Sequence, residues 1–534
     1  MPDWTYQPLR GIAAALLGGQ RSRRAALRTL ASIGSLPGGG RAIAWAFGHR
    51  HPPARLGGTA AGVPVAARLG AVVPPRLARS AVRAMPPLGA GLVVVEPVGP
   101  GDVAAVREAA RGRRVPVLAR VTGGQDADAV AEALAPYVDG VLTRPDPALR
   151  RVASPSVADA ARALDDPAAV VLAAPPVLVH AGPGWFARVT EAATPTAPLG
   201  PAREEIGRDP RRWPAWWWGT LVGLGMICAG LGAAAIALGP VLLWYDRAHL
   251  GAGVGELHAL DHHLVHFLRH DRITLAGAMV TIGVLYAGLA AGGMRRGLPW
   301  ARQAYLVSGW VGFPTLLYFL GLGFVEPLHT AAALVLFPMF LAATRREHAR
   351  PRWTPLSEGT DRERNRALTG QLLLILTGVG LFAGGVAVSS VGLTAVFVGS
   401  DLDFLHATAE ELRAANPRLL PFIAHDRAGF GGALMAAAAA VTLLSAWGWR
   451  RGEAWVWWSL LLAAGAGFLP AVAVHGSIRY TDFWHLAPVY AGMLLTAAGL
   501  ALARPYLCAR APDTAATAPR APGGRPGALA RRLR

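Results

Sequence analysis

The sequence predicts an α-helical polytopic membrane domain of eight spans, arranged as two four-helix repeats in parallel orientation and preceded by a partial β/α domain. Three observations lead to this fold class. The 534-residue chain is 53% hydrophobic and contains 64 Gly, which is too apolar for a pair of ordinary soluble domains. Charge-free runs long enough to cross a bilayer begin beyond residue 214. The tripeptide His-Asp-Arg occurs twice, at 270–272 and 425–427, each time ahead of such a run.

The charged residues argue against a nucleic-acid partner. The formal net charge is +19, and all 52 basic residues are Arg because the chain contains no Lys. These arginines lie beside apolar segments instead of forming one stripe with interleaved aromatics, which a nucleic-acid surface needs. The two cysteines, Cys228 and Cys508, argue against a disulfide framework or a cysteine metal site. The first residues lack the order of a secretory signal, so we expect the N-terminus to stay in the cytoplasm.

Composition divides the chain near a segment rich in Pro and charge, "TPTAPLGPAREEIGRDPRRWP". We expect a cytoplasmic domain at 1–193, a linker at 194–214, a first membrane repeat at 215–345, a cytoplasmic loop at 346–369, a second membrane repeat at 370–505 and a disordered basic tail at 506–534.

Each membrane repeat contains four apolar runs that suit about 30 Å of hydrocarbon, for which roughly 20 residues suffice. The expected spans are 217–243, 273–293, 303–324, 327–344, 370–397, 429–449, 454–474 and 486–503. Arginines fill every second loop, at 208–212, 295–302, 345–366 and 450–451, and recur in the tail. By the positive-inside rule these loops and both termini are cytoplasmic. We therefore expect a multi-pass protein of the bacterial plasma (inner) membrane, with the lipid bilayer as a partner.

The two membrane repeats match at an offset of 155 residues, which carries His270 onto His425. Asp246 then falls on Asp401. Since each repeat has an even number of spans, both copies keep the same orientation, and a pseudo-twofold axis should run along the membrane normal.

A polar cluster accompanies each repeat on the side expected to face outward. An acid-x-x-His motif, Glu326 to His329, falls on Asp482 to His485 at an offset of 156. This spacing puts the carboxylate and the imidazole on one helical face. We expect the groups of each repeat to converge, giving a candidate outer polar site of His270, Asp271, Arg272, Glu326 and His329 in the first repeat and of His425, Asp426, Arg427, Asp482 and His485 in the second.

Three interpretations of this site stay open. Asp271 and Asp426 could be N-caps that meet unpaired N–H groups, with the adjacent Arg neutralising them. The clusters could instead bind a proton or a quinone head group, because a carboxylate neighbour can set the tautomer and pKa of His. They could also bind a metal through His and carboxylate ligands.

The first outer loop is rich in histidine. His258, His262, His263 and His266 have as counterparts Arg413, Pro417, Arg418 and Pro421, which argues against a paired metal mechanism. The sequence still allows one metal site in this loop, with His262 and His266 four residues apart on one helical face.

The part before the linker alternates apolar runs with helical patterns over residues 91–193, as in "GLVVVEPV" followed by "GDVAAVREAARGR". Such alternation predicts parallel strands joined by helices. About 190 residues is short for an eight-stranded barrel, which needs around 250, so we expect a partial, TIM-barrel-like domain. Residues 5–48 form amphipathic, Arg-bearing helices that could lie on the membrane surface.

Several segments resemble a known family in the same order. "QRSRRAALRTLASIGSLPGGGRAIAWAFG" is similar to an N-terminal helical region, "LGAGLVVVEPVGP" to a strand and turn, "VPVLARV" to a strand with a flavin-contacting lysine, "VDGVLTR" to a later strand, and "VVLAAPPVLVHAGPGWFARV" to a closing strand and helix. The family is that of the quinone-linked (class 2) dihydroorotate dehydrogenases. The resemblance implies an FMN cofactor and a quinone partner.

Departures from that family argue against its activity. Arg120 stands where the family has its lysine, and no Lys can replace it. The only asparagines, Asn365 and Asn416, lie in the membrane part, and the segments for the catalytic base and the Gly-Gly phosphate cradle are missing. Gly182-Pro183 remains, where a helix start is sufficient explanation. FMN binding is therefore not expected, and the domain is interpreted as a non-catalytic pseudoenzyme.

Three functional hypotheses follow. The leading one is an integral membrane protein with a non-catalytic dehydrogenase-like domain and an outward polar site, for which quinone or a metal is the candidate ligand. The alternative is a flavin- and quinone-linked oxidoreductase with a membrane redox partner. A transporter comes third, because no charge lies deep within any expected span.

Overall fold

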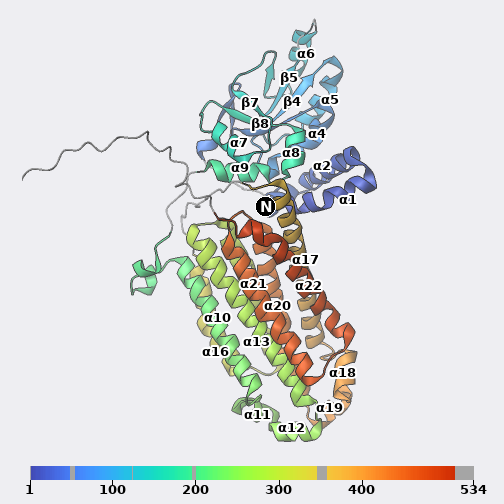
Figure 1. The fold of residues 1–534 in the computed structure, drawn as a ribbon, viewed down its shortest axis with the longest axis vertical. Helices are drawn as coiled ribbons and strands as arrows, with labels where there is room; N and C mark the ends of the chain where they lie inside the picture. Colours follow the sequence, from blue (N-terminus) through green and yellow to red (C-terminus); the bar gives the residue numbers. More distant parts are fainter. Residues whose placement is uncertain are drawn as a thin grey trace, which may run out of the picture.

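The computed structural model describes residues 2–47, 54–122, 124, 126–194, 200–345 and 358–510. An N-terminal α/β domain lies on one end of a bundle of long helices (Figure 1). We call the opposite end of the bundle the distal end; it carries the short helices α11 (Trp244–Leu250), α12 (Val254–Leu260), α18 (Gly399–Leu405) and α19 (Ala409–Ala415). Most of the expected tail, from 511 onward, and residues 346–357 of the expected central loop lie outside the described residues.

The α/β domain is built on a six-stranded sheet with the strand order β6-β5-β4-β3-β8-β7. Its strands are β3 (Leu69–Val73), β4 (Leu92–Val98), β5 (Val117–Val121), β6 (Gly140–Leu142), β7 (Leu149–Val152) and β8 (Val170–Ala173). Every neighbouring pair is parallel. The expected parallel β/α domain is thereby confirmed as a half-barrel, with β6 and β7 at its two edges.

Both faces of this sheet are covered. On β4, Val93 and Val95 pack toward the helices, whereas Leu92 and Val94 pack toward the small hairpin of β1 (Gly58–Ala60) and β2 (Val63–Val65). Successive side chains of a strand point to opposite faces, so a strand buried on both sides reads as an unbroken apolar run. The helices of the domain are α1 (Gln7–Leu17), α2 (Gly19–Ser35), α3 (Gly39–Phe47), α4 (Pro75–Ala84), α5 (Val103–Ala110), α6 (Ala127–Leu134), α7 (Val157–Ala163), α8 (Pro175–Ala181) and α9 (Trp185–Ala193).

Six helices of the bundle are long and apolar enough to cross a membrane. They are α10 (Ala215–Leu238), α13 (Leu264–Gly288, continued in irregular helix to Arg296), α17 (Asp361–Leu393), α20 (Leu419–Trp447), α21 (Ala454–Ile478) and α22 (Phe483–Leu507). Each overlaps most of one expected span, although α10 ends at Leu238 and α17 at Leu393, before the expected ends at 243 and 397. The protein is therefore a multi-pass, mostly helical membrane protein in which six candidate spans are supported.

The third and fourth expected spans fall on shorter helices. The chain forms α14 (Pro299–Thr315), a short α15 (Tyr318–Leu322) and α16 (Pro327–Ala343). Pro314 lies in the last turn of α14 and cannot donate a backbone hydrogen bond, and the continuous helix ends one residue later. The apolar run 303–324 is thus divided between two helices.

Helices α13 and α20 pack against each other in the middle of the bundle. Helix α13 also packs on α10 and α21, and α20 packs on α17 and α14. Helix α17 begins at Asp361, inside the segment expected to be a loop, and reaches toward the α/β domain (Figure 1). The distal polar residues are held in a frame of six packed helices, which are α10, α13, α14, α17, α20 and α21.

The α/β domain contacts the bundle through a buried carboxylate near the N-terminus. Oδ2 of Asp3 accepts from Arg188 on α9 and, at 2.8 Å, from Nη2 of Arg364 on α17. Its other oxygen accepts the backbone N–H of Gly184 at 2.7 Å. A Cβ at Gly182, which has φ +89°, would lie 2.4 Å from this carboxylate. The Gly-Pro pair predicted to start a helix therefore makes room for Asp3 between α8 and α9.

Candidate functional site

Two arginines cross between α13 and α20 near the distal end. Nε of Arg272 on α13 lies 3.0 Å from Oδ2 of Asp426 on α20. Nε of Arg427 on α20 lies 3.2 Å from Oδ2 of Asp271 on α13. The side chains of all four are at most 12% exposed. Because a buried charge needs a counter-charge, each helix supplies what the other requires.

Each arginine also pairs with a second aspartate, which lies in one of the short distal helices. Nη1 of Arg272 donates to Oδ2 of Asp246 at 3.0 Å, and Nη1 of Arg427 donates to Oδ2 of Asp401 at 2.6 Å. Burial alone would raise the pKa of Asp401, but the bond and charge of Arg427, with the N–H of Val398, lower it. Both guanidinium groups therefore remain paired to carboxylates from two directions.

The N-cap interpretation of Asp271 and Asp426 is wrong. Helix α13 has its N-cap at His263 and α20 at Arg418, so both aspartates lie well inside a helix. The helices start earlier than the expected spans because apolar residues ahead of each His-Asp-Arg motif are buried in a distal core; among them are Leu264, Phe267, Leu419 and Phe422. The two carboxylates bind side chains instead of helix N–H groups.

Each aspartate also binds the histidine that precedes it. Nδ1 of His270 lies 2.9 Å from Oδ1 of Asp271, and Nδ1 of His425 lies 3.1 Å from Oδ1 of Asp426. Each carboxylate therefore bridges its own histidine and the arginine of the facing helix. Such a bond fixes which ring nitrogen carries the hydrogen.

Each acid-x-x-His motif brings its histidine beside the facing repeat, which the sequence did not predict, although Glu326 and His329 also share a pocket with Arg272 of their own repeat, as expected. Glu326 and Asp482 are the N-caps of α16 and α22, and each accepts the backbone N–H of the histidine three residues later. The ring of His329 lies 5.7 Å from that of His425, and the ring of His485 lies 6.3 Å from that of His270. The ten candidate residues thus divide into two groups that each combine both halves of the bundle, with Asp482 exposed at the edge.

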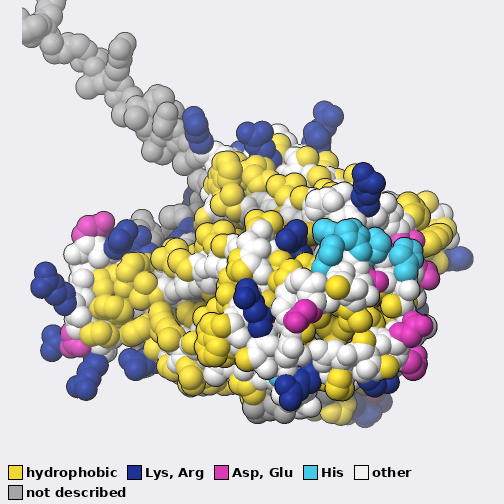
Figure 2. Space-filling model, turned by 90° about the horizontal axis from the view of Figure 1, so that it is seen from below, with side chains coloured by type: hydrophobic (Ala, Val, Ile, Leu, Met, Phe, Trp, Pro, Cys, Tyr) yellow, Lys and Arg dark blue, Asp and Glu magenta, His cyan; other side chains and the backbone are white. Residues whose placement is uncertain are grey.

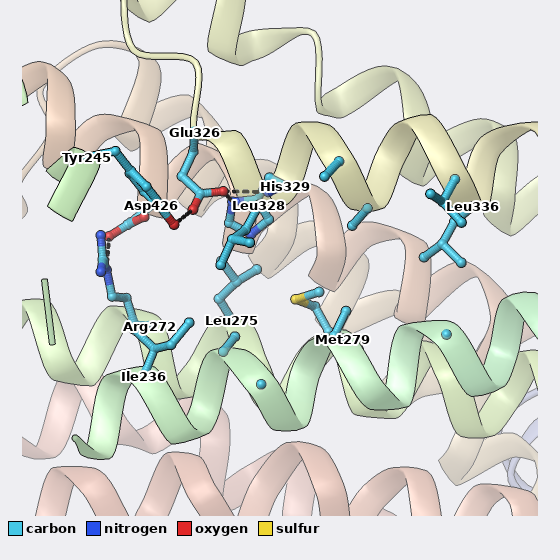
Figure 3. Close-up of a pocket in the computed structure, with 17 residues that line it drawn as sticks. Ile236, Tyr245, Arg272, Leu275, Met279, Glu326, Leu328, His329, Leu336 and Asp426 are labelled. Carbon is cyan, nitrogen blue, oxygen red and sulfur yellow. Dashed lines mark hydrogen bonds and ion pairs between the residues drawn. The ribbon is translucent and has the colours of Figure 1, made fainter. Parts of the chain in front are cut away.

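The first group lines a pocket of about 520 Å³ and is called the pocket cluster here: Tyr245, Arg272, Glu326, His329, His425 and Asp426. All of these except His425 line the cavity directly, and its other walls are apolar residues of α10, α13 and α16. Figure 3 shows the polar side chains gathered at one end of the cavity and apolar ones such as Met279 and Leu336 along the rest. Leu328 and Val335, also in its wall, are 50% and 61% exposed, so the pocket opens on the side of the bundle.

Glu326 organises the polar end of this pocket. Its carboxylate accepts the hydroxyl of Tyr245, and its Oε2 lies 2.8 Å from Nδ1 of His329. Burial alone would raise the pKa of Glu326, but the hydrogen bond and charge of His329, together with Tyr245, lower it to about 2. Burial and the bond to Glu326 raise the pKa of Tyr245. The pocket therefore presents an ionised carboxylate with an imidazole and a phenol bound to it.

The second group, the histidine cluster, contains His270, Asp271, Arg427, His475, Tyr480 and His485. Ring nitrogens of His270, His475 and His485 lie within 4.8 Å of one another, and the Nε2 atoms of His270 and His475 are 3.0 Å apart. His475 on α21 was not among the sequence candidates. The repeat offset could not find it, since the matching positions hold Phe319 and Leu320.

The loop histidines form a separate patch on the distal face (Figure 2). Nδ1 of His262 lies 3.1 Å from Nε2 of His258, and the rings of His262 and His266 are 5.5 Å apart. Within the described part of the chain, three ligand atoms converge at His270, His475 and His485 and not at the expected pair. Sequence spacing thus placed His262 beside both His258 and His266, but among the described residues these three rings do not bring three nitrogens within 4.8 Å of one another.

Comparison with protein-family models, with curated proteins and with solved structures found no match for this chain.

Proposed function

We propose that this chain is an integral membrane protein whose helical module binds the head group of a lipid-soluble quinone in the pocket cluster, while the docked α/β domain is non-catalytic. The observation that carries this proposal is the pocket that opens between α10 and α16, with Glu326, His329 and Tyr245 at its polar end. Its volume lies in the range of ligand pockets, about 300–1,000 Å³.

The lining suits an amphipathic ligand. Apolar side chains such as Leu275, Met279 and Leu336 would contact an isoprenoid tail or ring methyl groups. Tyr245 already gives its hydroxyl hydrogen to Glu326, so hydrogen bonds to the quinone oxygens would come from the Arg272 guanidinium and from Nε2 of His329 when that ring carries both hydrogens. On reduction of the quinone, His329 in that form would pass it a proton. A side entrance between helices admits a ligand that is dissolved in the bilayer.

We further propose that the bundle is a duplicated four-helix module of eight spans, with α14–α15 and α16 as the third and fourth. The contacts of the arginines support this, because Arg272 reaches Val241 and Asp246 whereas Arg427, 155 residues later, reaches Val396 and Asp401. A pseudo-twofold axis between α13 and α20 relates the two sets. The distribution of Arg supports a cytoplasmic α/β domain and cytoplasmic termini, with the distal end outside the plasma membrane.

The non-catalytic role of the α/β domain is supported by an ion-pair cluster on the sheet. Arg120 on β5 lies 3.4 Å from Glu96 on β4, and Arg151 on β7 pairs with the same carboxylate. In the resemblance to the quinone-linked dehydrogenases, this cluster stands at the place of the flavin-contacting lysine. The domain would then act through its contacts with the bundle.

A second candidate is the flavin- and quinone-linked oxidoreductase that the resemblance implies. It is favoured by a cavity of about 590 Å³ between the N-terminal helices and the α/β domain, lined by Arg23, Arg24 and Arg76 among apolar residues. Flavin absorbance of the purified protein separates the two candidates, because the leading proposal predicts that the α/β domain carries no flavin.

Quinone titration of the protein in nanodiscs tests the leading proposal. We expect a soluble short-chain ubiquinone or menaquinone analogue to quench tryptophan fluorescence saturably, and Glu326→Gln to weaken its affinity about tenfold, because the loss of the carboxylate releases both His329 and Tyr245. Ala332→Trp, which fills the pocket wall, should abolish binding. Asp482→Asn is the matched control, since the equivalent acid lies outside the pocket. Equal affinities for Glu326→Gln, Ala332→Trp and the wild type would refute a quinone site here.

A further inference from the structure

We propose that His270, His475 and His485 bind one divalent transition-metal ion through three imidazole nitrogens. This site lies in the histidine cluster and does not depend on quinone binding in the pocket cluster. Helix α13 supplies one ligand, and α21 and α22 supply the other two.

The hydrogen bonds of two rings leave lone pairs facing each other. Nδ1 of His475 lies 2.7 Å from the carbonyl oxygen of Ala471, which can only accept. Nδ1 of His270 lies 2.9 Å from Asp271, whose other oxygen binds Arg427 and which is therefore an ionised acceptor. A neutral imidazole has one N–H, so the hydrogen of each ring is on Nδ1. The two Nε2 atoms, 3.0 Å apart, then both present lone pairs, and a cation between them removes their repulsion.

The third ring is positioned in the same manner. Tyr480 donates its hydroxyl hydrogen to Oδ1 of Asp401 at 2.8 Å, and its oxygen lies 3.2 Å from Nδ1 of His485. This chain of bonds favours the hydrogen of His485 on Nδ1 and leaves Nε2 as the donor atom for a metal. Metal-binding histidines characteristically give their other ring N–H to a carboxylate or a backbone carbonyl. Here such an acceptor is supplied to each ring, directly or through Tyr480.

The composition of the site selects the kind of ion. Three neutral imidazoles suit Zn²⁺, Cu²⁺ and similar first-row ions, whereas Mg²⁺ and Ca²⁺ prefer oxygen ligands. The surrounding carboxylates Asp271 and Asp401 outnumber the single guanidinium of Arg427, so the surroundings favour a cation. His270 and His475 are buried at 6% and 4% exposure, whereas His485 is only partly buried and marks the accessible side. A fourth position on that side is left for water or an exogenous ligand.

The pocket cluster serves as an internal comparison. By the repeat offset, His425 corresponds to His270 and His329 corresponds to His485. The positions that correspond to His475 are Phe319 and Leu320, neither of which is a histidine. The third ligand thus distinguishes the two clusters. We expect the metal to bind on one side of the pseudo-twofold axis.

Metal analysis of the full-length protein, purified without a histidine tag, tests this inference. After chelation, reloading with Cu²⁺ and removal of unbound metal, we expect one ion per chain in a background in which His258, His262 and His266 are Ala. His475→Leu in that background should lower the content at least tenfold, whereas His329→Ala should leave it unchanged. An electron paramagnetic resonance spectrum whose nitrogen splitting changes on ¹⁵N-histidine labelling would identify imidazole ligands in the folded protein without relying on a variant.

Three results would overturn the site. They are retention of one ion by His475→Leu, loss of the ion on His329→Ala, and absence of bound metal from the folded background protein. Size-exclusion profiles and tryptophan fluorescence that match the background protein show that His475→Leu is folded.

Discussion

Asp271 and Asp426 each connect two groups, because one oxygen binds the adjacent histidine and the other binds the arginine of the facing helix. Removing one carboxylate leaves a buried guanidinium short of a partner, which costs about 3–5 kcal/mol in buried pairs. Since Arg272 keeps Asp246, we expect Asp426→Asn to lower the free energy of unfolding by about 3 kcal/mol, at the lower end of that range.

The double variant Arg272→Met/Asp426→Asn should be less destabilised than the sum of the two single variants, because neither charge of this pair is then left without the other, while the loss of Arg272 from Asp246 is counted once in the single and once in the double variant. Chemical unfolding in detergent measures all members of this cycle. Additive losses would show that the two side chains do not interact, contrary to the 3.0 Å contact.

At the scale of helices, small residues let neighbouring helices approach each other closely. A Cβ on Gly385 of α17 would lie 2.8 Å from the carbonyl oxygen of Gly431 on α20, and a Cβ on Gly230 of α10 would lie 2.8 Å from that of Ala276 on α13. Backbone atoms cannot move aside as the ends of flexible side chains can. We expect Gly385→Ala to destabilise the bundle by about 1–3 kcal/mol, as overpacking does.

The neighbouring Gly384 is a matched control, since a Cβ there meets nothing within 4 Å. Gly384→Ala should be neutral or stabilise by up to about 1 kcal/mol through helix propensity. Thermal midpoints in detergent separate the two variants. Similar midpoints for both would mean that α17 and α20 are not in close contact.

Elements with a strong local pattern were predictable from the sequence. Long charge-free apolar runs predicted the six long helices, and short apolar runs that alternate with helical patterns predicted the strands and helices of the α/β domain. Their ends were not predictable, because α13 and α20 continue through His-Asp-Arg only when Phe267 and Phe422 are buried under the short distal helices. The strand β3 was missed because it lies ahead of the alternating region, at the centre of the sheet.

Contacts between elements depend on the arrangement of helices, which no spacing along the chain encodes. A repeat offset identifies residues in equivalent positions, but it does not show that Glu326 shares a pocket with Asp426 of the other half, or that His485 lies beside His270. His475 has no equivalent and could be found only from the packing of α21 on α13. For this reason the candidate residues were predictable individually, whereas their grouping was not.

At the scale of the whole molecule, the α/β domain depends on charge for its attachment to the bundle. Asp3 joins Arg188 of the domain to Arg364 of α17, while Glu191 binds Arg450 beyond α20 with an Oε2–Nε distance of 2.7 Å. Burial alone would raise the pKa of Asp3, but the charges of Arg188 and Arg364 and the N–H of Gly184 outweigh it and lower the pKa below 3.8. The carboxylate is thus ionised in the docked state over the physiological range.

Because the pKa of Asp3 is lower in the folded protein than in the unfolded one, its contribution to stability is complete above 3.8 and is lost as the pH falls through the lowered value. We expect Asp3→Asn to lower the thermal midpoint at pH 7 and to increase deuterium uptake of α9 and the first turn of α17, while Asp128→Asn, an exposed acid of the same domain, changes neither. The difference in midpoint between wild type and Asp3→Asn should stay constant from pH 7 to about pH 5 and disappear at acidic pH below the lowered pKa. A difference that persists there unchanged would show that the charge of Asp3 does not hold the domain, and the attachment would then rest on Glu191 and on the ring contact of Trp45 on α3 with Trp447 on α20.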